Sequence, residues 1–390
     1  MLEYNPNKRP TAEQIVHKVA FMMNKMSARN LNIISCYTIP DISVDSSIPK
    51  YLHHDRRFVH FISKFSIILH FFPLYIRRQN FISHCSYVCR LDLSRSDMDV
   101  ELTRITCSHH SSIQQIVKSD NHFIALSSDN RVYSWGNGPN GELGHGQEMI
   151  SLMNAKIINL LGHSIIKIGC GKGFSVFVDR NGFVLTCGSH RSCCLGSNEL
   201  TDRFRPAIVI ELMRFNVIDV DCSEDHVVVV TSDGHVYGWG YNHNGKLGIQ
   251  TNQQQAVVFP TCIRLNCQVK NVICGTNATA FIDHNGSVWL CGDNRFNKLA
   301  LNNYHFLWKK QITIATRPIR CEAINGRVKD VCLGEKHSFF ILHDDTIIAA
   351  GDNSDGQLGL HHRKSIGKPI RVPPLKPKQQ IKVSNVYHSS

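Results

Sequence analysis

A block of about fifty residues recurs five times in this chain and constrains the fold more than any other sequence feature. Each copy contains an anchor glycine that follows a short apolar run. The steps between these glycines are 52, 52, 52 and 59 residues, and the five are Gly136, Gly188, Gly240, Gly292 and Gly351. Self-similarity at a nearly constant period is the signature of a repeat fold.

Other positions keep a fixed distance from the anchor glycine. The position eight residues after it holds glycine in four copies and alanine in the fourth copy. Tryptophan precedes the anchor in two copies, as Trp135 and Trp239. The position fourteen residues before it holds His122, Phe174, His226, Ala278 and His337, and the position eighteen before it holds Lys118, Cys170, Cys222, Cys274 and Leu333. These shared offsets fix the register of the repeat.

The copies have the sequence pattern of short strands. In the third copy, apolar runs at Val217–Val220, Val227–Thr231 and His235–Trp239 are separated by turn residues, Asp233-Gly234 among them. Short β-rich runs bounded by Asp-Gly or Asn-Gly predict hairpins, because glycine adopts the positive φ that tight turns need. One such unit cannot bury both faces of its sheet. Several arranged radially can, which predicts a mainly β fold, a β-propeller.

The repeat resembles one propeller family in particular. The tryptophans are not followed by aspartate and the chain has no Gly-Gly pair, which argues against WD-type and kelch-type blades. The chain resembles the regulator-of-chromosome-condensation repeat over about residues 113–362. The matching residues are Cys274-Gly275, His226, Asp233-Gly234, Trp239-Gly240 and Gly245-Lys246-Leu247-Gly248. Cys193 and Asn297 depart from the pattern, since other copies have a loop glycine at Gly141, Gly245 and Gly356.

We therefore assign residues 99–390 to propeller repeats, with five complete blades. Val383–His388 resembles the first strand of a sixth blade. Propellers of the resembling family usually have seven blades, so we expect an incomplete, open ring with exposed edges. Both ends of the chain read as if cut from a longer parent.

Residues 1–26 form a separate segment. Thr11 after Pro10 is typical of a helix N-cap, and Ile15, Val16 and Val19 would form an apolar stripe. The segment resembles the last helices of a protein-kinase domain, where an arginine at the place of Arg9 pairs with a glutamate that this chain lacks. An amphipathic helix of no special origin explains it as well.

The combination with propeller repeats resembles one group of NIMA-related Ser/Thr kinases. Glu224–Thr231 and Phe296–Asn302 also resemble that group. The kinase glycine loop, strand lysine, His-Arg-Asp loop and Asp-Phe-Gly are absent, so we expect no enzymatic activity from the chain as written. His54-Asp55-Arg56 lacks the following asparagine. Gly136–Gly141 fits G-x-G-x-x-G but lies between strands, so we interpret it as a blade turn.

Residues 27–98 match neither neighbour and are predicted to be a poorly ordered linker or insert. Phe58–Ile76 is nearly long enough to span a membrane, but it contains Lys64 and Pro73 as well as two histidines. Cys85 and Cys89, with Cys107, His109 and His110 further on, lack a usual zinc spacing. We therefore predict no metal and no cofactor, and keep a membrane tether only as a third hypothesis.

Charge and cysteine content limit the possible partners. The formal net charge is +12, but +6 of it falls between Lys50 and Arg95, so the propeller is only mildly basic and no nucleic-acid binding is expected. The fifteen cysteines include repeat-column members, which indicates free thiols in a reducing compartment.

The repeat residues are predicted to be structural. His122, His226 and His337 would lie one per blade and hydrogen-bond neighbouring turns, while Trp135 and Trp239 would pack in the core or between blades. The long step between the fourth and fifth copies contains Trp308, Lys309 and Lys310, the candidate interaction loop.

The resemblance implies a regulatory, protein-binding propeller that restrains a kinase domain. Its implied partners are a kinase domain or other NIMA-related kinases, and its implied location is the cytoplasm, with a centrosome, spindle or cilium role. The alternative is guanine-nucleotide exchange on, or binding of, a small GTPase. That activity depends on an extended wedge between strands, for which the 52-residue steps leave little room.

Overall fold

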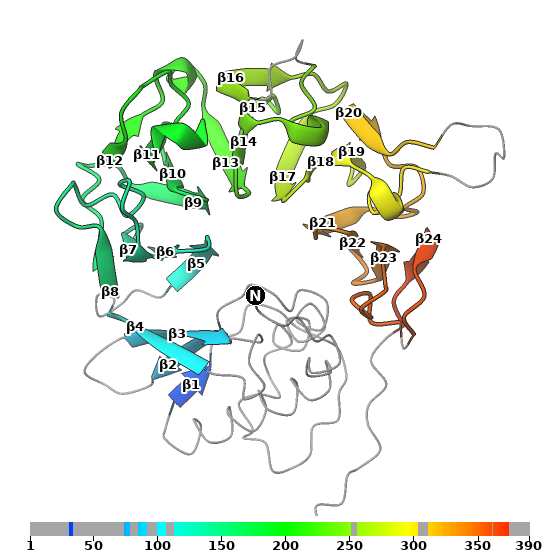
Figure 1. Ribbon diagram of the computed structural model, residues 1–390, viewed down its shortest axis with the longest axis horizontal. Helices are drawn as coiled ribbons and strands as arrows, with labels where there is room; N and C mark the ends of the chain where they lie inside the picture. The colour runs from blue at the N-terminus through cyan, green and yellow to red at the C-terminus, as the bar shows by residue number, and fades with distance from the viewer. Residues whose placement is uncertain are drawn as a thin grey trace, which may run out of the picture.

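The structure is a computed structural model, and it describes residues 113–250, 256–302, 311–360 and 362–373, together with four strands before them. Residues 113–373 form five four-stranded antiparallel sheets in chain order (Figure 1). The predicted mainly β propeller with five complete blades is confirmed.

Each blade is a meander of four consecutive strands. Blade I contains β5 (Ile113–Lys118), β6 (His122–Ser127), β7 (Val132–Asn137) and β8 (Ser151–Ile157). Blade II contains β9 (Ile165–Gly171), β10 (Phe174–Asp179), β11 (Val184–Gly188) and β12 (Arg203–Ile208). Blade III contains β13 (Val217–Cys222), β14 (His226–Thr231), β15 (Val236–Tyr241) and β16 (Ala256–Ile263). Blade IV contains β17 (Val269–Gly275), β18 (Ala278–Asp283), β19 (Val288–Asp293) and β20 (Ile314–Arg320). Blade V contains β21 (Val328–Leu333), β22 (His337–Leu342), β23 (Ile347–Gly351) and β24 (Ile366–Arg371).

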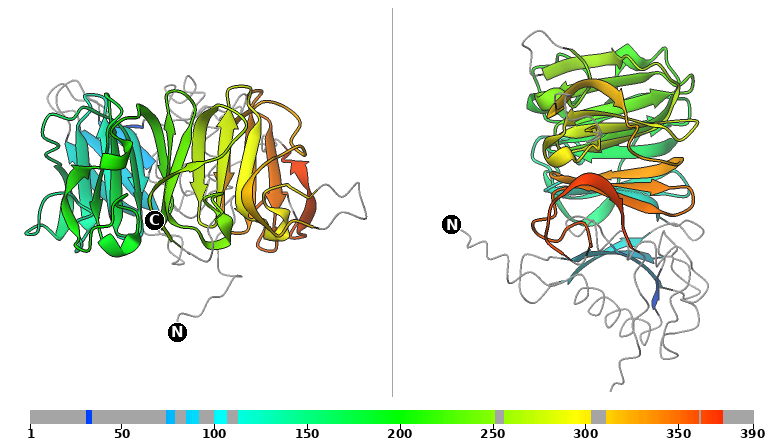
Figure 2. Two further views of the ribbon diagram at one scale, coloured as in Figure 1. Left: turned by 90° about the horizontal axis from the view of Figure 1, so that it is seen from above. Right: turned by 90° about the vertical axis from the view of Figure 1, so that its right-hand side faces the viewer.

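The blades form an arc in which the first strand of each blade lies toward the centre and the fourth strand lies at the outside (Figure 1). Seen from the side, the arc is a disk with two faces (Figure 2). Because the strands alternate in direction, the turns between first and second strands and the connections between third and fourth strands share one face. We call this the loop face. It carries three 3-10 turns, which are η3 (His190–Ser192), η5 (His243–Gly245) and η6 (Arg295–Asn297).

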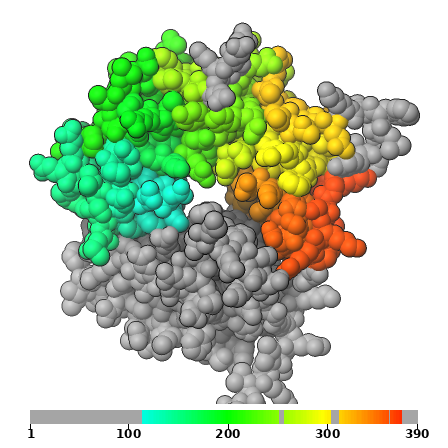
Figure 3. Space-filling view, in the orientation of Figure 1, coloured from blue at the N-terminus to red at the C-terminus, as the bar shows by residue number. Residues whose placement is uncertain are grey.

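Most of the hydrophobic core lies between neighbouring blades, and two smaller clusters lie within blade I and within blade V. The cluster around Phe174 and Trp239 draws residues from blades II and III, and the cluster around Leu290 and Phe340 draws residues from blades IV and V. Similar clusters join blades I and II and blades III and IV. The apolar side chains of these clusters are therefore buried only where one blade packs on its neighbour. The blades follow one another around the arc in chain order (Figure 3).

The anchor glycines lie where the third strand passes the start of the second. All five have φ between +103° and +125°. A Cβ at Gly240 would lie 2.5 Å from the carbonyl oxygen of Asp225 and 2.7 Å from the Cα of His226. The same two backbone positions are approached at the other anchors. Both the backbone conformation and the close approach require glycine here.

A second glycine position packs each blade against the next one. A Cβ at Gly144 would lie 3.3 Å from Pro206, and one at Gly248 would lie 2.8 Å from Pro318. Both prolines belong to the outer strand of the following blade. A Cβ at Gly359 of blade V would meet no described atom within 4 Å. Among the described residues, no outer strand follows blade V to pack against this glycine.

A sixth four-stranded sheet lies beside blade I (Figure 1). It contains β1 (Leu31–Ile33), β2 (Leu74–Arg78), β3 (Cys85–Leu91) and β4 (Val100–Thr106), in that order and antiparallel, and β4 contacts β8. Residues 27–98 were predicted to be a poorly ordered linker or insert, and β1, β2 and β3 lie within them. The fourth strand of this sheet, β4, lies beyond residue 98.

Several predicted segments lie outside the described residues. They are the kinase-like helix in 1–26, most of Phe58–Ile76 and the start of a sixth blade at Val383–His388. Within the ranges that the structure describes, no helix is long and apolar enough to cross a membrane. The eleven cysteines described with their side chains are all free thiols.

Candidate protein-binding face and the seams behind it

Polar side chains link blade I to blade II beneath the loop face. His122 is fully buried at the start of β6, and its Nδ1 lies 2.6 Å from the Ser119 hydroxyl. Its Nε2 lies 2.9 Å from the hydroxyl of Ser175, on β10 of the next blade. Ser175 in turn donates to the backbone oxygen of Glu142 at 2.7 Å. Burial lowers the pKa of His122 to about 4, so the imidazole is neutral at pH 7.

We call the contact between two neighbouring blades a seam. The seam between blades III and IV has the same arrangement as the seam between blades I and II. His226 Nδ1 lies 2.6 Å from the Ser223 hydroxyl, and Nε2 lies 3.0 Å from the hydroxyl of Thr279. Thr279 donates to the backbone oxygen of Lys246 at 2.6 Å. Two histidines of one repeat column are therefore structural links between blades, and neither is aimed at an open site.

The alternate seams replace these links by simpler ones. Between blades II and III, the histidine position is Phe174 and the hydroxyl position is Val227, and both pack in one apolar cluster. Between blades IV and V, the histidine position is Ala278, and Ser338 donates directly to the backbone oxygen of Lys298 at 2.5 Å. His337 is half-buried and meets Phe339 edge-on at 5.5 Å.

The two tryptophans of the repeat pack differently, one within its own blade and one against the neighbouring blade. Trp135 stacks on Phe123 of the same blade, with ring centroids 5.1 Å apart. Trp239 is fully buried and donates from Nε1 to the backbone oxygen of Cys194, in blade II, at 2.8 Å.

Two buried lysines beneath the loop face each bond to the next blade. Lys246 is 1% exposed, forms an ion pair with Asp225 and donates to the backbone oxygen of Thr276 in the next blade at 3.2 Å. Burial acts to raise the pKa of Asp225, but the hydrogen bonds from His226 and Lys246 outweigh it and lower the pKa.

Lys298 takes the same position in blade IV and is also 1% exposed. It donates to the backbone oxygen of Glu335 in blade V at 2.7 Å and lies 3.7 Å from the Asp293 carboxylate. Burial lowers the pKa of Lys298 to about 8, against the opposing effect of Asp293. Lys246 and Lys298 therefore join neighbouring blades, and we call them staples. Because both are buried, they are not available to a ligand.

Blade IV carries exposed side chains on the loop face, outside the buried lysines. Arg295 is largely exposed, and three contacts of 2.9–3.1 Å to the Asp293 carboxylate fix its guanidinium. Phe296 follows it with a φ of 61° and a side chain that is 51% exposed. A bulky residue with positive φ carries backbone strain, and the equivalent residue of blade III, Asn244, has nearly the same φ of 58°. In blade III, His243 stacks on Tyr241 with centroids 5.4 Å apart.

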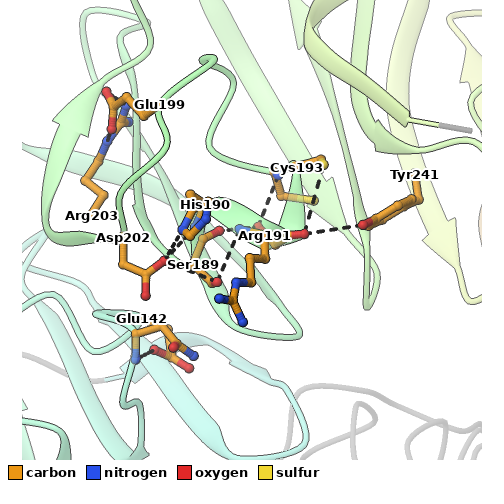
Figure 4. A network of polar contacts seen from close by, with 12 residues as sticks. Glu142, Ser189, His190, Arg191, Cys193, Glu199, Asp202, Arg203 and Tyr241 are labelled. Carbon is orange, nitrogen blue, oxygen red and sulfur yellow. Dashed lines mark hydrogen bonds and ion pairs between the residues drawn. The ribbon is translucent and has the colours of Figure 1, made fainter. Parts of the chain in front are cut away.

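Blade II contributes a polar network to the same face (Figure 4). His190 Nδ1 lies 2.6 Å from the Asp202 carboxylate, which also accepts from the Ser189 hydroxyl at 3.3 Å. Burial acts to raise the pKa of Asp202, but the bonds from His190 outweigh it and lower the pKa. Tyr241 of blade III donates to the backbone oxygen of Arg191 at 3.4 Å. The turn η3 of blade II is therefore bonded to Asp202 within its own blade and to Tyr241 of blade III.

The loop face has the features of a contact surface. In the ranges with described side chains, no group of three or more His, Cys, Asp or Glu residues could hold a metal ion. The hydroxyl groups beside His122 and His226 are held in the seams. The exposed side chains of this face include the Phe296 ring, the fixed Arg295 guanidinium, Ile150 and Leu200, together with several polar side chains. Such a mixture suits protein recognition.

The predicted site residues are distributed one per blade and do not converge on a single point. The anchor glycines lie within their own blades, as does Trp135. His122, His226 and Trp239 each contact a neighbouring blade. The predicted interaction loop, Trp308-Lys309-Lys310, lies outside the described residues. Sequence reasoning missed the staples Lys246 and Lys298 and the hydroxyl column Ser175, Thr279 and Ser338. The sequence did carry a signal for the hydroxyl column, because Ser175, Thr279 and Ser338 occupy the same position in second strands that are otherwise largely apolar.

Fold and surface together define a repeat β-propeller in which buried polar and apolar contacts join neighbouring blades. The chain belongs to the RCC1-like domain family, whose family model matches residues 90–389. This confirms the resemblance to regulator-of-chromosome-condensation repeats.

The relatives include the propeller-bearing kinases that the sequence resembles. The chain is 27% identical over 285 residues to the serine/threonine-protein kinase Nek9 of Xenopus laevis, which is 70% of this chain and 30% of that protein. It is 27% identical over 222 residues to Nek8 of Danio rerio, which is 54% of this chain and 31% of that protein. The chain thus spans about a third of the length of these kinases.

A solved structure shows the same fold. Prp20p from Saccharomyces cerevisiae superposes with a TM-score of 0.62 at 20% identity, covering 78% of this chain and 75% of that one.

Proposed function

We propose that this chain is a non-catalytic, protein-binding propeller of the type carried by NIMA-related kinases, and that its loop face binds a kinase domain. The observation that carries the proposal is the exposed pair Arg295 and Phe296 on the loop face. Asp293 holds the Arg295 guanidinium, and Phe296 follows it in a turn with positive φ. The similarity to Nek9 and Nek8 supports the choice of partner.

The physical argument rests on preorganisation. Aromatic and arginine side chains contribute most to protein interfaces, and they do so best when few rotamers must be frozen on binding. The guanidinium of Arg295 is held by its carboxylate partner, and the turn η6 fixes the backbone of Phe296. A regulatory propeller in the cytoplasm, at the centrosome, spindle or cilium, is the role that the resemblance implies.

The test is binding of the full chain to the purified kinase domain of frog Nek9, measured by biolayer interferometry. We expect Phe296→Ala and Arg295→Ala each to weaken binding by about ten-fold. Ile210→Ala is the matched control, since Ile210 is 74% exposed in η4 (Ile210–Leu212), which connects β12 to β13 on the opposite face. Absence of binding by the parent chain, or equal losses in all three variants, would contradict the proposal.

Binding of a small GTPase is the second candidate. The observation in its favour is the fold shared with Prp20p, whose structure was reported with its binding to Gsp1p and histones. Accelerated release of a fluorescent guanine nucleotide from Gsp1p by this chain would favour exchange activity. Unchanged release together with kinase-domain binding would favour the first candidate.

A further inference from the structure

The charges of the blades are sorted by strand position. The five outer strands β8, β12, β16, β20 and β24, which we call the rim, contain seven lysines and arginines and no acidic residue. The other fifteen blade strands contain four lysines and six aspartates. The propeller is only mildly basic in total, and this average conceals a rim of uniform sign.

The rim cations are available to a partner. Arg203 is buried and pairs with Glu199, but the other six are exposed, and they are Lys156, Arg205, Arg317, Arg320, Lys368 and Arg371. Arg320 donates to the Ser287 hydroxyl and Arg371 to the Thr346 hydroxyl, at 3.3 and 2.9 Å. Within the described ranges, no carboxylate forms an ion pair with any of these six.

Blades IV and V present the same short segment twice. β20 contains Arg317-Pro318-Ile319-Arg320, and β24 contains Lys368-Pro369-Ile370-Arg371. The two outer strands belong to neighbouring blades on the outside of the arc (Figure 1). The two segments therefore present a doubled basic motif on adjacent blades.

Apolar side chains lie among these charges. Ile314 and Ile370 are 46% and 41% exposed, and Phe259 on the outer strand of blade III is 45% exposed. The prolines of β20 and β24 lack an N–H group, so these strand edges are poorly suited to pairing with an added strand. A partner must therefore dock mainly through side chains.

We propose that the rim of blades IV and V binds an extended acidic protein segment whose carboxylates alternate with apolar side chains. Carboxylates match the four exposed cations, and apolar side chains match Ile314 and Ile370. An extended polypeptide can follow the convex outside of the arc. Nucleic acid fits less well, because two cations per blade make no continuous phosphate track and the exposed isoleucines match no phosphate.

The test uses the full chain and a fluorescein-labelled synthetic peptide of alternating glutamate and leucine, followed by anisotropy. The rim variant is Arg320→Glu with Arg371→Glu. The matched control is Lys172→Glu with Lys336→Glu, two exposed loop-face lysines that give the same change in net charge. We expect about a ten-fold loss of affinity for the rim variant and less than about two-fold for the control.

Three outcomes would overturn the proposal: no binding by the parent chain, equal losses in both variants, or tighter binding of a 20-base-pair DNA duplex that the rim variant abolishes. Arg320→Gln with Arg371→Gln serves as a second rim pair, and thermal unfolding of every variant checks the fold. Because the proposed kinase-domain contact uses Arg295 and Phe296 on the loop face, the rim variant should leave it intact. Failure of one proposal is therefore distinguishable from failure of the other.

Discussion

Asn297 donates from Nδ2 to the backbone oxygen of Gly367 at 2.9 Å, and this bond joins the loop of blade IV to the outer strand of blade V. At the preceding seam the roles are reversed. Gly245 holds the loop position, and a Cβ there would lie 2.7 Å from the Cα of Thr316, the residue equivalent to Gly367. One seam has its glycine in the loop and the other has it in the strand. Asn297 adopts a φ of 55°, which asparagine tolerates.

This relationship predicts coupling between positions 297 and 367. Gly367→Thr should destabilise the fold by roughly 1 to 3 kcal/mol, because its side chain competes with the Asn297 amide for the same seam. Asn297→Gly combined with Gly367→Thr copies the Gly245–Thr316 seam and should recover at least about 1 kcal/mol. Urea unfolding of the parent, both single variants and the double variant gives the coupling. Strictly additive effects would contradict the exchange.

Gly240→Val should cost more than about 2 kcal/mol, since it combines positive φ with a clash against the backbone of blade III. Gly162→Val is the control, because Gly162 has a φ of +88° but no atom within 4 Å of its Cβ position. It should show only the smaller conformational cost. The difference between their urea midpoints isolates the clash, and equal midpoints would show that the clash is absent.

Thr279→Val should destabilise the seam between blades III and IV by roughly 1 to 3 kcal/mol. It removes the hydroxyl that lies against His226 and bonds the backbone oxygen of Lys246. The double variant His226→Phe with Thr279→Val reproduces the Phe174–Val227 seam and should be more stable than the single variant. If the double variant is the less stable of the two in denaturant titration, the two seams are not interchangeable.

Acid should weaken the fold through His122. Burial lowers its folded-state pKa from 6.5 to about 4, so the unfolded chain binds this proton first as the pH falls. The stabilisation is complete above pH 6.5 and is lost toward pH 4, with a limiting slope of about 1.4 kcal/mol per pH unit. The variant His122→Phe with Ser175→Val lacks this component. Urea unfolding at pH 7 and pH 5 should show a smaller change for the variant, and identical changes would exclude the assignment.

The two partners of the Lys246–Asp225 pair should differ in their cost of removal. Asp225→Ala leaves a buried ammonium without its counter-charge and should cost roughly 3 kcal/mol. Lys246→Met keeps the buried chain length and leaves a carboxylate that is a third exposed to water, so its cost should be less than about 1.5 kcal/mol. Thermal and urea unfolding at neutral pH compare the two. A larger cost for Lys246→Met would contradict the staple.

The repeat columns were sufficient to predict the propeller and the number of complete blades. Glycine positions such as Gly240 carry their backbone requirement in the sequence itself, so their register could be inferred without contacts. The hairpins followed from turn residues such as Gly234.

The seams could not be predicted in the same way. Ser175 lies 53 residues from His122, and nothing local in the sequence shows that the two side chains meet. Burial of Lys246 and Lys298 contradicts the usual exposure of lysine and becomes visible only when the next blade supplies carbonyl partners. The rim charge was hidden because net charge averages over strands that face different surroundings.

The seams also restrict how such a chain can grow by gene duplication. A tandem copy of blade II would set Phe174 of the first copy against a serine equivalent to Ser175, with no imidazole to bond it. A copied blade IV would place Asn297 of the first copy opposite Thr316 of the second copy rather than opposite Gly367. Each blade is matched to one predecessor and one successor, so a copy of two neighbouring blades is accepted more readily than a copy of one. In evolutionary terms, the order of the blades is inherited along with their sequences.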